Sequence, residues 1–262
     1  MKYGFIGCGN MGGSLARSLR KNTNDIAIAD PSEKAKELAG ELGVFYTDSQ
    51  TVASDCDRIF LGVKPHMVEA CLAPYQAVLQ QRKPLLITMA AGLEIQRIEA
   101  FVGVHLPVIR IMPNTPTAVG KGVILYCCND LVTPEILNDW LADMSGCGYL
   151  DALNESLIDA ASALSGSGPA YLYVFLEALA DGAVACGLPR DKALAYAAAT
   201  VEGAAQMVLG TGQHPGALKD AVCSPGGSTI AGLGVLEQRG FRSAAIDCIK
   251  AAYAKNKELG KS

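Results

Sequence analysis

The first half of the chain alternates short apolar runs with segments of helical periodicity. The apolar runs are rich in β-branched and aromatic side chains, which is typical of strands buried on both faces of a parallel sheet. The expected strands are 3–6, 26–29, 44–46, 58–63, 85–89 and 108–111. The expected helices between them are 14–21, 32–42, 68–81 and 94–101. This alternation predicts a doubly wound α/β sheet.

The strand pattern fades after about residue 152, and the rest of the chain is typical of helices. Segments 123–127, 134–144 and 149–151 are expected to close the α/β domain. The helices expected after it are 156–164, 170–187, 190–209, 215–223, 228–238 and 240–258. Small residues spaced three and four apart let such helices approach closely, within a subunit or between subunits. We therefore predict an α/β domain over 1–152 and an all-α domain over 153–262.

Composition narrows the class of protein. The 262 residues carry a net charge of −4, which indicates no nucleic-acid partner, and only 18% of them are charged. The most apolar run holds Glu177 and Asp181, so we expect a buried helix there and no membrane span. The start MKYGFIG enters a strand at once without a signal-peptide pattern, and the nine cysteines show no C-x-x-C pair. A cytoplasmic protein with reduced thiols is expected.

A glycine-rich loop follows the first expected strand and opens a helix. It has the G-x-G-x-x-G spacing, and its residues are Gly7, Cys8, Gly9, Asn10, Met11 and Gly12. The three glycines permit a tight turn, a close approach of backbone to pyrophosphate, and close helix–strand packing. The phosphates would meet free N–H groups at the helix start. The alternative interpretation is a tight strand-to-helix turn without a ligand.

Asp30 ends the second expected strand, where an acidic side chain can accept hydrogen bonds from the adenosine ribose of NAD. The same carboxylate would repel the 2′-phosphate of NADP, although Ser32, Lys34 and Lys36 follow and could compensate. Asp30 could also simply cap the next helix. The choice between NADH and NADPH stays open at this stage.

Other loops are expected to line the cofactor crevice, because ligands of doubly wound sheets lie beyond the carboxyl ends of the strands. Small side chains would admit a flat ring, and a carboxamide offers both donors and acceptors. Lys64 could equally be a solvated loop residue. The expected crevice residues are Val63, Lys64, Pro65, Ala90, Ala91, Gly92 and Asn114.

Acid–base and metal-binding groups are scarce. The three histidines do not cluster, no group of side chains resembles a metal site, and no nucleophile elbow follows a strand. Dehydrogenases that resemble this two-domain plan place a catalytic Lys shortly after a Gly-rich turn, yet here the first Lys after Gly168 is Lys192. Alcohol oxidation needs a general base, whereas the nitrogen of a C=N bond is itself basic. The absence of the Lys favours imine reduction.

A second Pro/Gly turn precedes an expected helix at Pro225-Gly226-Gly227-Ser228-Thr229. Free N–H groups of Gly227, Ser228 and Thr229 would point outward at the helix start and could hold a small carboxylate. The alternative is a hydroxyl-capped helix after a turn.

This turn and several other motifs of the chain resemble those of a known family. KDAVCSPGGSTIAGL, over 219–233, is similar to the signature of the pyrroline-5-carboxylate reductases of proline synthesis. The motifs GFIGCGNMG, GVKP, MAAG, RIMPNTP, LSGSGPAY, HPGALKD and GFRSAAI follow in the family's order over essentially the whole chain. The resemblance implies a Rossmann domain followed by a helical dimerisation domain. It also implies homodimers that assemble further, commonly as decamers, and reduction of 1-pyrroline-5-carboxylate to L-proline by NADPH or NADH.

The resemblance also implies roles for individual residues. Backbone N–H groups of Gly227, Ser228 and Thr229 would hold the substrate carboxylate, and the Thr229 hydroxyl would lie near the ring nitrogen as the catalytic candidate. Ser224 and Glu155 match family positions near the substrate, and Glu155 could also be a helix-start carboxylate. Asp48 stands where the family often has Asn near the adenosine. With Asp30, it makes the 2′-phosphate region acidic and leaves the cofactor preference in doubt.

Two competing interpretations remain. One is a β-hydroxyacid dehydrogenase with the same domain plan, against which the missing Lys and the 224–229 turn both count. The other is a protein that binds a nucleotide without catalysing a reaction.

Overall fold

The computed structural model describes residues 2–259 and forms two compact units. Unit 1 holds the chain up to Ser167 together with the residues from Ala252 onward, and unit 2 holds Gly168–Ala251. This division falls after helix α8 (Ile158–Ser165), later than the boundary expected after residue 152. The last turns of the chain belong to unit 1 and not to the helical unit.

Unit 1 is built on an eight-stranded sheet with the order β3-β2-β1-β4-β5-β6-β7-β8. The first six strands are parallel, as the apolar runs predict, β7 is antiparallel to β6, and β8 is parallel to β7. Their bounds are β1 Tyr3–Ile6, β2 Ile26–Ala29, β3 Phe45–Tyr46, β4 Arg58–Leu61, β5 Leu85–Thr88, β6 Val108–Met112, β7 Gly122–Cys128 and β8 Gly148–Ala152. The strand order reverses between β1 and β4, which is where such sheets bind ligands.

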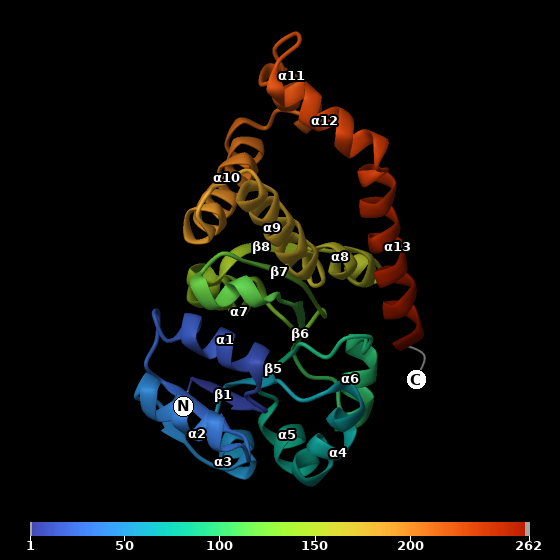
Figure 1. Cartoon of the computed structure of the whole chain (residues 1–262). Coiled ribbons are helices and arrows are strands. Elements are labelled where there is room, and N and C mark those ends of the chain that lie inside the picture. The colour runs from blue at the N-terminus through green and yellow to red at the C-terminus, as the bar shows by residue number, and fades with distance from the viewer. Residues whose placement is uncertain (1, 260–262) are drawn as a thin grey trace. The chain divides into compact units, whose positions relative to one another are not determined.

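Helices cover both faces of this sheet (Figure 1). On one face, α1 (Asn10–Leu19), α2 (Glu33–Leu42) and α7 (Pro134–Met144) share a buried apolar cluster with Phe5 and Phe60, whose rings stack at 4.5 Å. On the other face, α3 (Ser49–Asp55), α4 (Val68–Leu72), α5 (Gln76–Arg82) and α6 (Ile95–Val102) form the second cluster. The two clusters explain why the strands are apolar on both faces.

Several local predictions were wrong for identifiable reasons. The segment 44–46 is predicted to be a buried strand. The observed strand β3 is exposed, because it lies at the edge of the sheet. The continuous helix predicted over 68–81 is broken into α4, a 3₁₀ turn at Ala73–Tyr75, and α5. Pro74 lies in that turn and cannot donate a helical hydrogen bond. Helix α3 was not predicted, although Asp48 caps it through the Thr51 N–H at 2.7 Å.

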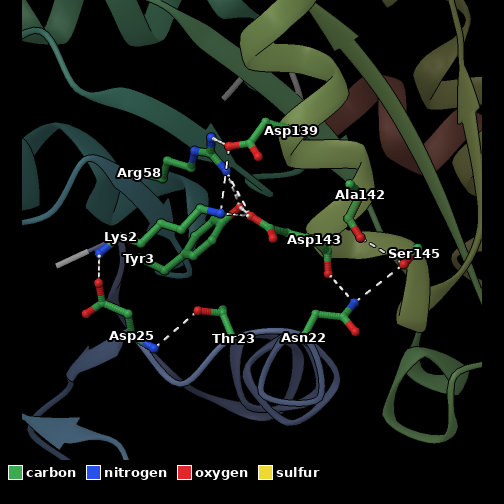
Figure 2. A network of polar contacts seen from close by, with 10 residues as sticks. All are labelled: Lys2, Tyr3, Asn22, Thr23, Asp25, Arg58, Asp139, Ala142, Asp143 and Ser145. Carbon is green, nitrogen blue, oxygen red and sulfur yellow. Dashed lines mark hydrogen bonds and ion pairs between the residues drawn. The ribbon is translucent and has the colours of Figure 1, made fainter.

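A polar network fastens α7 to the amino-terminal ends of β1 and β4 (Figure 2). The Tyr3 hydroxyl donates to Asp143 at 2.7 Å, Arg58 donates to the same Tyr3 oxygen at 2.6 Å, and Lys2 pairs with Asp143 at 2.7 Å. Burial raises the pKa of Tyr3, and its bond to Asp143 raises it further. This network lies at the strand ends opposite the expected ligand edge, and it joins α7 to the sheet.

Unit 2 is entirely helical over its described residues. It contains α9 (Gly168–Ala185), α10 (Arg190–Thr211), α11 (Pro215–Ala221), α12 (Ser228–Gln238) and the first part of α13 (Phe241–Leu259). Many large apolar side chains of this unit are exposed, including Tyr173, Val174, Leu209 and Val235. Exposed apolar surface on this scale marks an interaction face. Among the described helices, none has the length and apolarity needed to span a membrane.

Candidate active site

The glycine loop joins β1 to α1 with the geometry of a phosphate cradle. Gly7 has a φ of +85°, which a side chain would strain, and its N–H donates to the Ala29 carbonyl at 2.9 Å. Gly9 occupies the N-cap position of α1 without a side-chain cap, so the helix leaves its first N–H groups unpartnered. Beyond Gly9 itself and its two neighbours in the chain, no protein atom lies within 4 Å of where a Gly9 Cβ would be. That open space next to unpartnered N–H groups fits a pyrophosphate.

Gly62 completes this cradle, although the sequence analysis did not single it out. A Cβ on Gly62 would lie 2.1 Å from the Gly7 carbonyl oxygen, and the Gly62 N–H donates to Ile6 at 2.8 Å. A Cβ on Gly12 would likewise lie 2.9 Å from the Gly7 oxygen. The loop therefore keeps its shape only between two glycines. The signal in the sequence was a Gly near the end of the fourth expected strand, 58–63.

Asp30 lies at the end of β2, and both of its carboxylate oxygens are engaged. Oδ2 accepts from the Cys8 N–H at 2.6 Å, and Oδ1 accepts from the N–H and hydroxyl of Ser32 at 2.8 and 2.6 Å. Partial burial raises the pKa of Asp30, but the hydrogen bonds from Ser32 and Cys8 outweigh it, so the pKa lies below its ordinary value. Asp30 is thus an ionised group built into the glycine loop.

The other acidic residue expected near the adenosine has a local role. Asp48 is the N-cap of α3, and the hydrogen bond from the Thr51 N–H lowers its pKa. Tyr46 donates to the Asp30 carbonyl at 2.7 Å, which ties β3 to the end of β2. Lys34 and Lys36 are exposed, and Lys36 pairs with Glu33 at 3.5 Å. The surroundings of Asp30 therefore carry both signs of charge.

The loops at the carboxyl ends of β4 and β5 differ in how far their residues are exposed. Val63 is half-buried beside Gly7, Lys64 is exposed, and Pro65 opens a 3₁₀ turn at Pro65–Met67. In the next loop Ala90 is buried, while Ala91 is exposed and Gly92 half-buried. Both loops belong to unit 1, at the same sheet edge as the glycine loop.

Asn114 differs from expectation. Its side chain is only 6% exposed, and its carboxamide is used inside the protein. Nδ2 donates to the Ser165 carbonyl at 2.9 Å, and Oδ1 accepts from the Val123 N–H at 2.8 Å. The residue therefore links the loop after β6 to β7 and to the last residue of α8, and this internal role replaces the free donor and acceptor that the sequence suggested.

The 224–229 segment of unit 2 forms a turn that leads into α12. Gly226 has a φ of +69°, and a Cβ on Gly227 would lie 2.4 Å from the Ser224 hydroxyl oxygen. The Gly227 N–H donates to the Ser224 carbonyl at 3.0 Å, so the expectation that this N–H is free was wrong. Gly227 caps α12 without a side-chain hydrogen bond. The N–H groups of Ser228 and Thr229 open the helix and have no partner within it.

Glu155 and Arg110 form an ion pair in unit 1 that the sequence analysis did not foresee. Arg110 is 2% exposed on β6, and its Nη1 lies 3.1 Å from Glu155 Oε1. A charged residue inside the apolar run 108–111 was the available signal, because a buried charge requires a partner. Across the described residues, no group of His, Cys, Asp or Glu could hold a metal ion.

A doubly wound sheet with an unobstructed glycine cradle at its switch point is typical of a dinucleotide-binding protein. Two sequence-family models match the chain. The "NADP oxidoreductase coenzyme F420-dependent" model matches residues 2–92, and the "Pyrroline-5-carboxylate reductase dimerisation" model matches residues 155–259.

Relatives cover the chain from end to end. Pyrroline-5-carboxylate reductase of Escherichia coli K12 is 41% identical over 100% of this chain and 99% of its own, and that of Arabidopsis thaliana is 38% identical over 100% and 96%. The crystal structure of Plasmodium falciparum pyrroline carboxylate reductase with NADP bound is 33% identical, with a TM-score of 0.90 over 99% of this chain and 98% of that one. The chain belongs to the pyrroline-5-carboxylate reductase family, and it is an NAD(P)H-dependent oxidoreductase acting on a C=N bond.

Proposed function

We propose that the protein reduces 1-pyrroline-5-carboxylate to L-proline at a site that includes the start of α12. The observation that carries this proposal is the uncapped helix start after the 224–227 turn, where the N–H groups of Ser228 and Thr229 are free of the helix. A small carboxylate fits such a helix start in charge and size. Gly227 contributes by allowing the turn to close on Ser224, since a side chain there would collide with the Ser224 hydroxyl.

Unit 1 supplies the proposed cofactor site. The open space at Gly9 and the unpartnered N–H groups of α1 fit the pyrophosphate of NADPH or NADH. The bound nicotinamide supplies a hydride to the imine carbon, and the ring nitrogen ends with a proton. The proposed cofactor residues are Gly7, Gly9, Asn10, Met11, Gly12, Asp30, Asp48, Val63, Lys64, Pro65, Ala90, Ala91 and Gly92. Asn114 supports this edge from inside the protein.

Thr229 is the proposed catalytic residue. Its hydroxyl is exposed at the start of α12, one residue beyond the first free N–H group. A Thr hydroxyl is too weak an acid to protonate the nitrogen unaided, so we assign it an orienting hydrogen bond to a substrate whose nitrogen is already protonated. Ser224 lies at the other end of the turn and is proposed to contact the substrate as well.

The assembly and location follow from the same features. The exposed apolar helices of unit 2 coincide with the dimerisation family match, and we propose that such dimers assemble further, as in a decamer. All nine cysteines are free thiols, which suits a reducing compartment, and we propose that the protein acts in the cytoplasm.

The experiment is the initial rate of reduction of 1-pyrroline-5-carboxylate, measured as loss of reduced nicotinamide, with NADPH and NADH in parallel. Turnover with either cofactor supports the proposal. A β-hydroxyacid is the competing substrate, tested as oxidation with NAD and NADP. A folded protein that binds a cofactor but turns over neither substrate would overturn the proposal and favour a nucleotide-binding protein without catalysis.

A further inference from the structure

Helix α6 begins without a cap of its own. Its N-cap residue, Glu94, makes no side-chain capping bond, and Glu is not among the short polar residues that usually cap a helix. The cap comes instead from Glu155, 60 residues further along the chain, whose Oε1 accepts from the Ile95 N–H at 2.8 Å. A carboxylate at a helix start satisfies a free N–H group and opposes the positive end of the helix dipole. Glu155 therefore fixes where α6 begins.

The same oxygen of Glu155 is held in place by Arg110. Nη1 of Arg110 lies 3.1 Å from Oε1 of Glu155, and Nη2 lies 3.3 Å from Oδ1 of Asp159. Arg110 is 2% exposed, and its Nε has no hydrogen-bond partner in the described structure, so the two carboxylates alone orient the guanidinium. Arg110 lies on β6, a central strand that cannot shift easily. The ion pair thus anchors Glu155, and through it the start of α6, to the sheet.

This anchor lies between the two loops that follow β5 and β6. The loop after β5 contains Ala90, Ala91 and Gly92 and leads into α6. The first residue of α6, Ile95, donates its N–H to Glu155. The loop after β6 starts three residues beyond Arg110, and its Asn114 donates to the Ser165 carbonyl at the end of α8. The segment 155–165 therefore contacts Ile95, which directly follows the loop whose small side chains are expected to admit a flat ring, and Asn114 in the loop after β6.

We propose that Glu155 is a positioning residue for hydride transfer, which acts through the Ile95 N–H to hold the 90–92 loop in place and does not bind the substrate. The inference rests on the proposed function and assigns Glu155 a different role from the one the family resemblance implies. The β5 end of the loop is fixed by the sheet, so the α6 end decides its shape. Displacing a reacting group by about 1 Å can lower a rate about a hundredfold.

The test compares Glu155→Gln, Glu155→Ala and the neighbouring Glu94→Gln as a matched control. The Gln amide oxygen can still accept from the Ile95 N–H but lacks the charge that orients Arg110, whereas Ala provides neither. We expect kcat to fall by about tenfold in Glu155→Gln and by about a hundredfold in Glu155→Ala. The KM for 1-pyrroline-5-carboxylate should stay within about twofold of wild type in both. Glu94→Gln should match wild type.

Three outcomes would overturn the inference. A KM for the imine that rises tenfold or more with kcat retained would make Glu155 a substrate ligand. A lower melting temperature with unchanged kcat per folded enzyme would leave only a structural role. Equal losses in Glu155→Gln and Glu155→Ala would exclude the capping bond as the route.

The dissociation constant of NADPH, followed by nicotinamide fluorescence, gives a readout that does not need turnover. We expect it to rise in the order wild type, Glu155→Gln, Glu155→Ala, because the 90–92 loop loses its fixed end. If wild type binds NADPH but reduces no imine, the proposed function fails, while this order still decides whether Glu155 positions the loop. An unchanged dissociation constant in both variants would then overturn the inference.

Discussion

The backbone N–H of Cys8 donates to the carboxylate of Asp30 at 2.6 Å. This bond joins the middle of the glycine loop to the end of β2, so the group that faces the adenosine ribose in such folds also shapes the phosphate cradle. Burial raises the pKa of the Cys8 thiol to about 12, and the charge of Asp30 adds to the effect. Cys8 is therefore an un-ionised, buried side chain. Asp30 carries the negative charge beside the glycine loop.

The charge of Asp30 should set the cofactor preference. Asp30→Asn removes the negative charge and keeps an oxygen that can accept from the Cys8 N–H. We expect the ratio of kcat/KM with NADPH to that with NADH to rise about tenfold, or about 1.4 kcal/mol. Glu37→Gln, an exposed charge on α2, is the control and should leave the ratio unchanged. A ratio that does not move in Asp30→Asn would show that the carboxylate is structural only.

Gly9 should matter for the cofactor and little for the fold. A Cβ there meets no protein atom within 4 Å, so Gly9→Ala should change the free energy of unfolding by less than about 1 kcal/mol. The same methyl group would occupy the space that the pyrophosphate needs. We expect the dissociation constants of NADPH and NADH to rise at least about tenfold, measured by nicotinamide fluorescence. Unchanged affinity would mean that the phosphates lie elsewhere.

Gly62 should matter both for cofactor binding and for the stability of the fold. A Cβ at this position would lie 2.1 Å from the Gly7 carbonyl oxygen, which is backbone and cannot rotate away. We expect Gly62→Ala to lower the free energy of unfolding by about 2 kcal/mol or more in chemical denaturation, and to weaken cofactor binding as the loop shifts. Gly40→Ala is the control, because its Cβ would meet nothing within 4 Å and helix α2 should gain up to about 1 kcal/mol. Equal stability of both variants would contradict the close approach.

Thr229 should contribute through its hydroxyl. Thr229→Ser keeps a hydroxyl at the start of α12 and should retain much of the kcat. Thr229→Ala should lose about a hundredfold or more, the scale of one well-placed hydrogen-bonding group. Thr200→Ala, on the exposed surface of α10, serves as the control for losing a threonine hydroxyl in unit 2. Near wild-type rates in both Thr229 variants would remove this residue from the mechanism.

His105 should make stability depend on pH. Its hydrogen bond with Glu99, at 2.5 Å, and the charges of Glu99 and Asp130 raise the pKa of His105 above its ordinary value. The folded state thus favours the protonated ring. This contribution is fully present below the unfolded-state pKa of about 6.5 and is lost as the pH rises through the higher folded-state pKa.

We therefore expect His105→Gln to lower the melting temperature at about pH 5.5 and to match wild type at alkaline pH. The exposed ring belongs to unit 1, and His66→Gln, also in unit 1 and also exposed, is the control. A difference between wild type and His105→Gln that grows as the pH rises would contradict the sign of the shift. The measurement is thermal unfolding by circular dichroism over the pH range.

The sequence by itself determined the layered fold, the glycine loop and the family. These depend on local patterns: apolar strands, helical periodicity, and glycines that a turn requires wherever the chain goes next. It also indicated the turn before α12, because Pro-Gly-Gly followed by Ser-Thr is a local signal of a helix start.

Only the tertiary structure decided how the polar side chains are used. It assigned the Asn114 carboxamide to Ser165 and Val123, the Gly227 N–H to Ser224, and Glu155 to Arg110 and Ile95. The bonds of Asn114 to Ser165 and of Glu155 to Arg110 and Ile95 join residues distant in the chain, and a buried polar group must find a partner wherever packing places one. Spacing along a sequence predicts which face a side chain occupies, but not which distant backbone or charge will satisfy it.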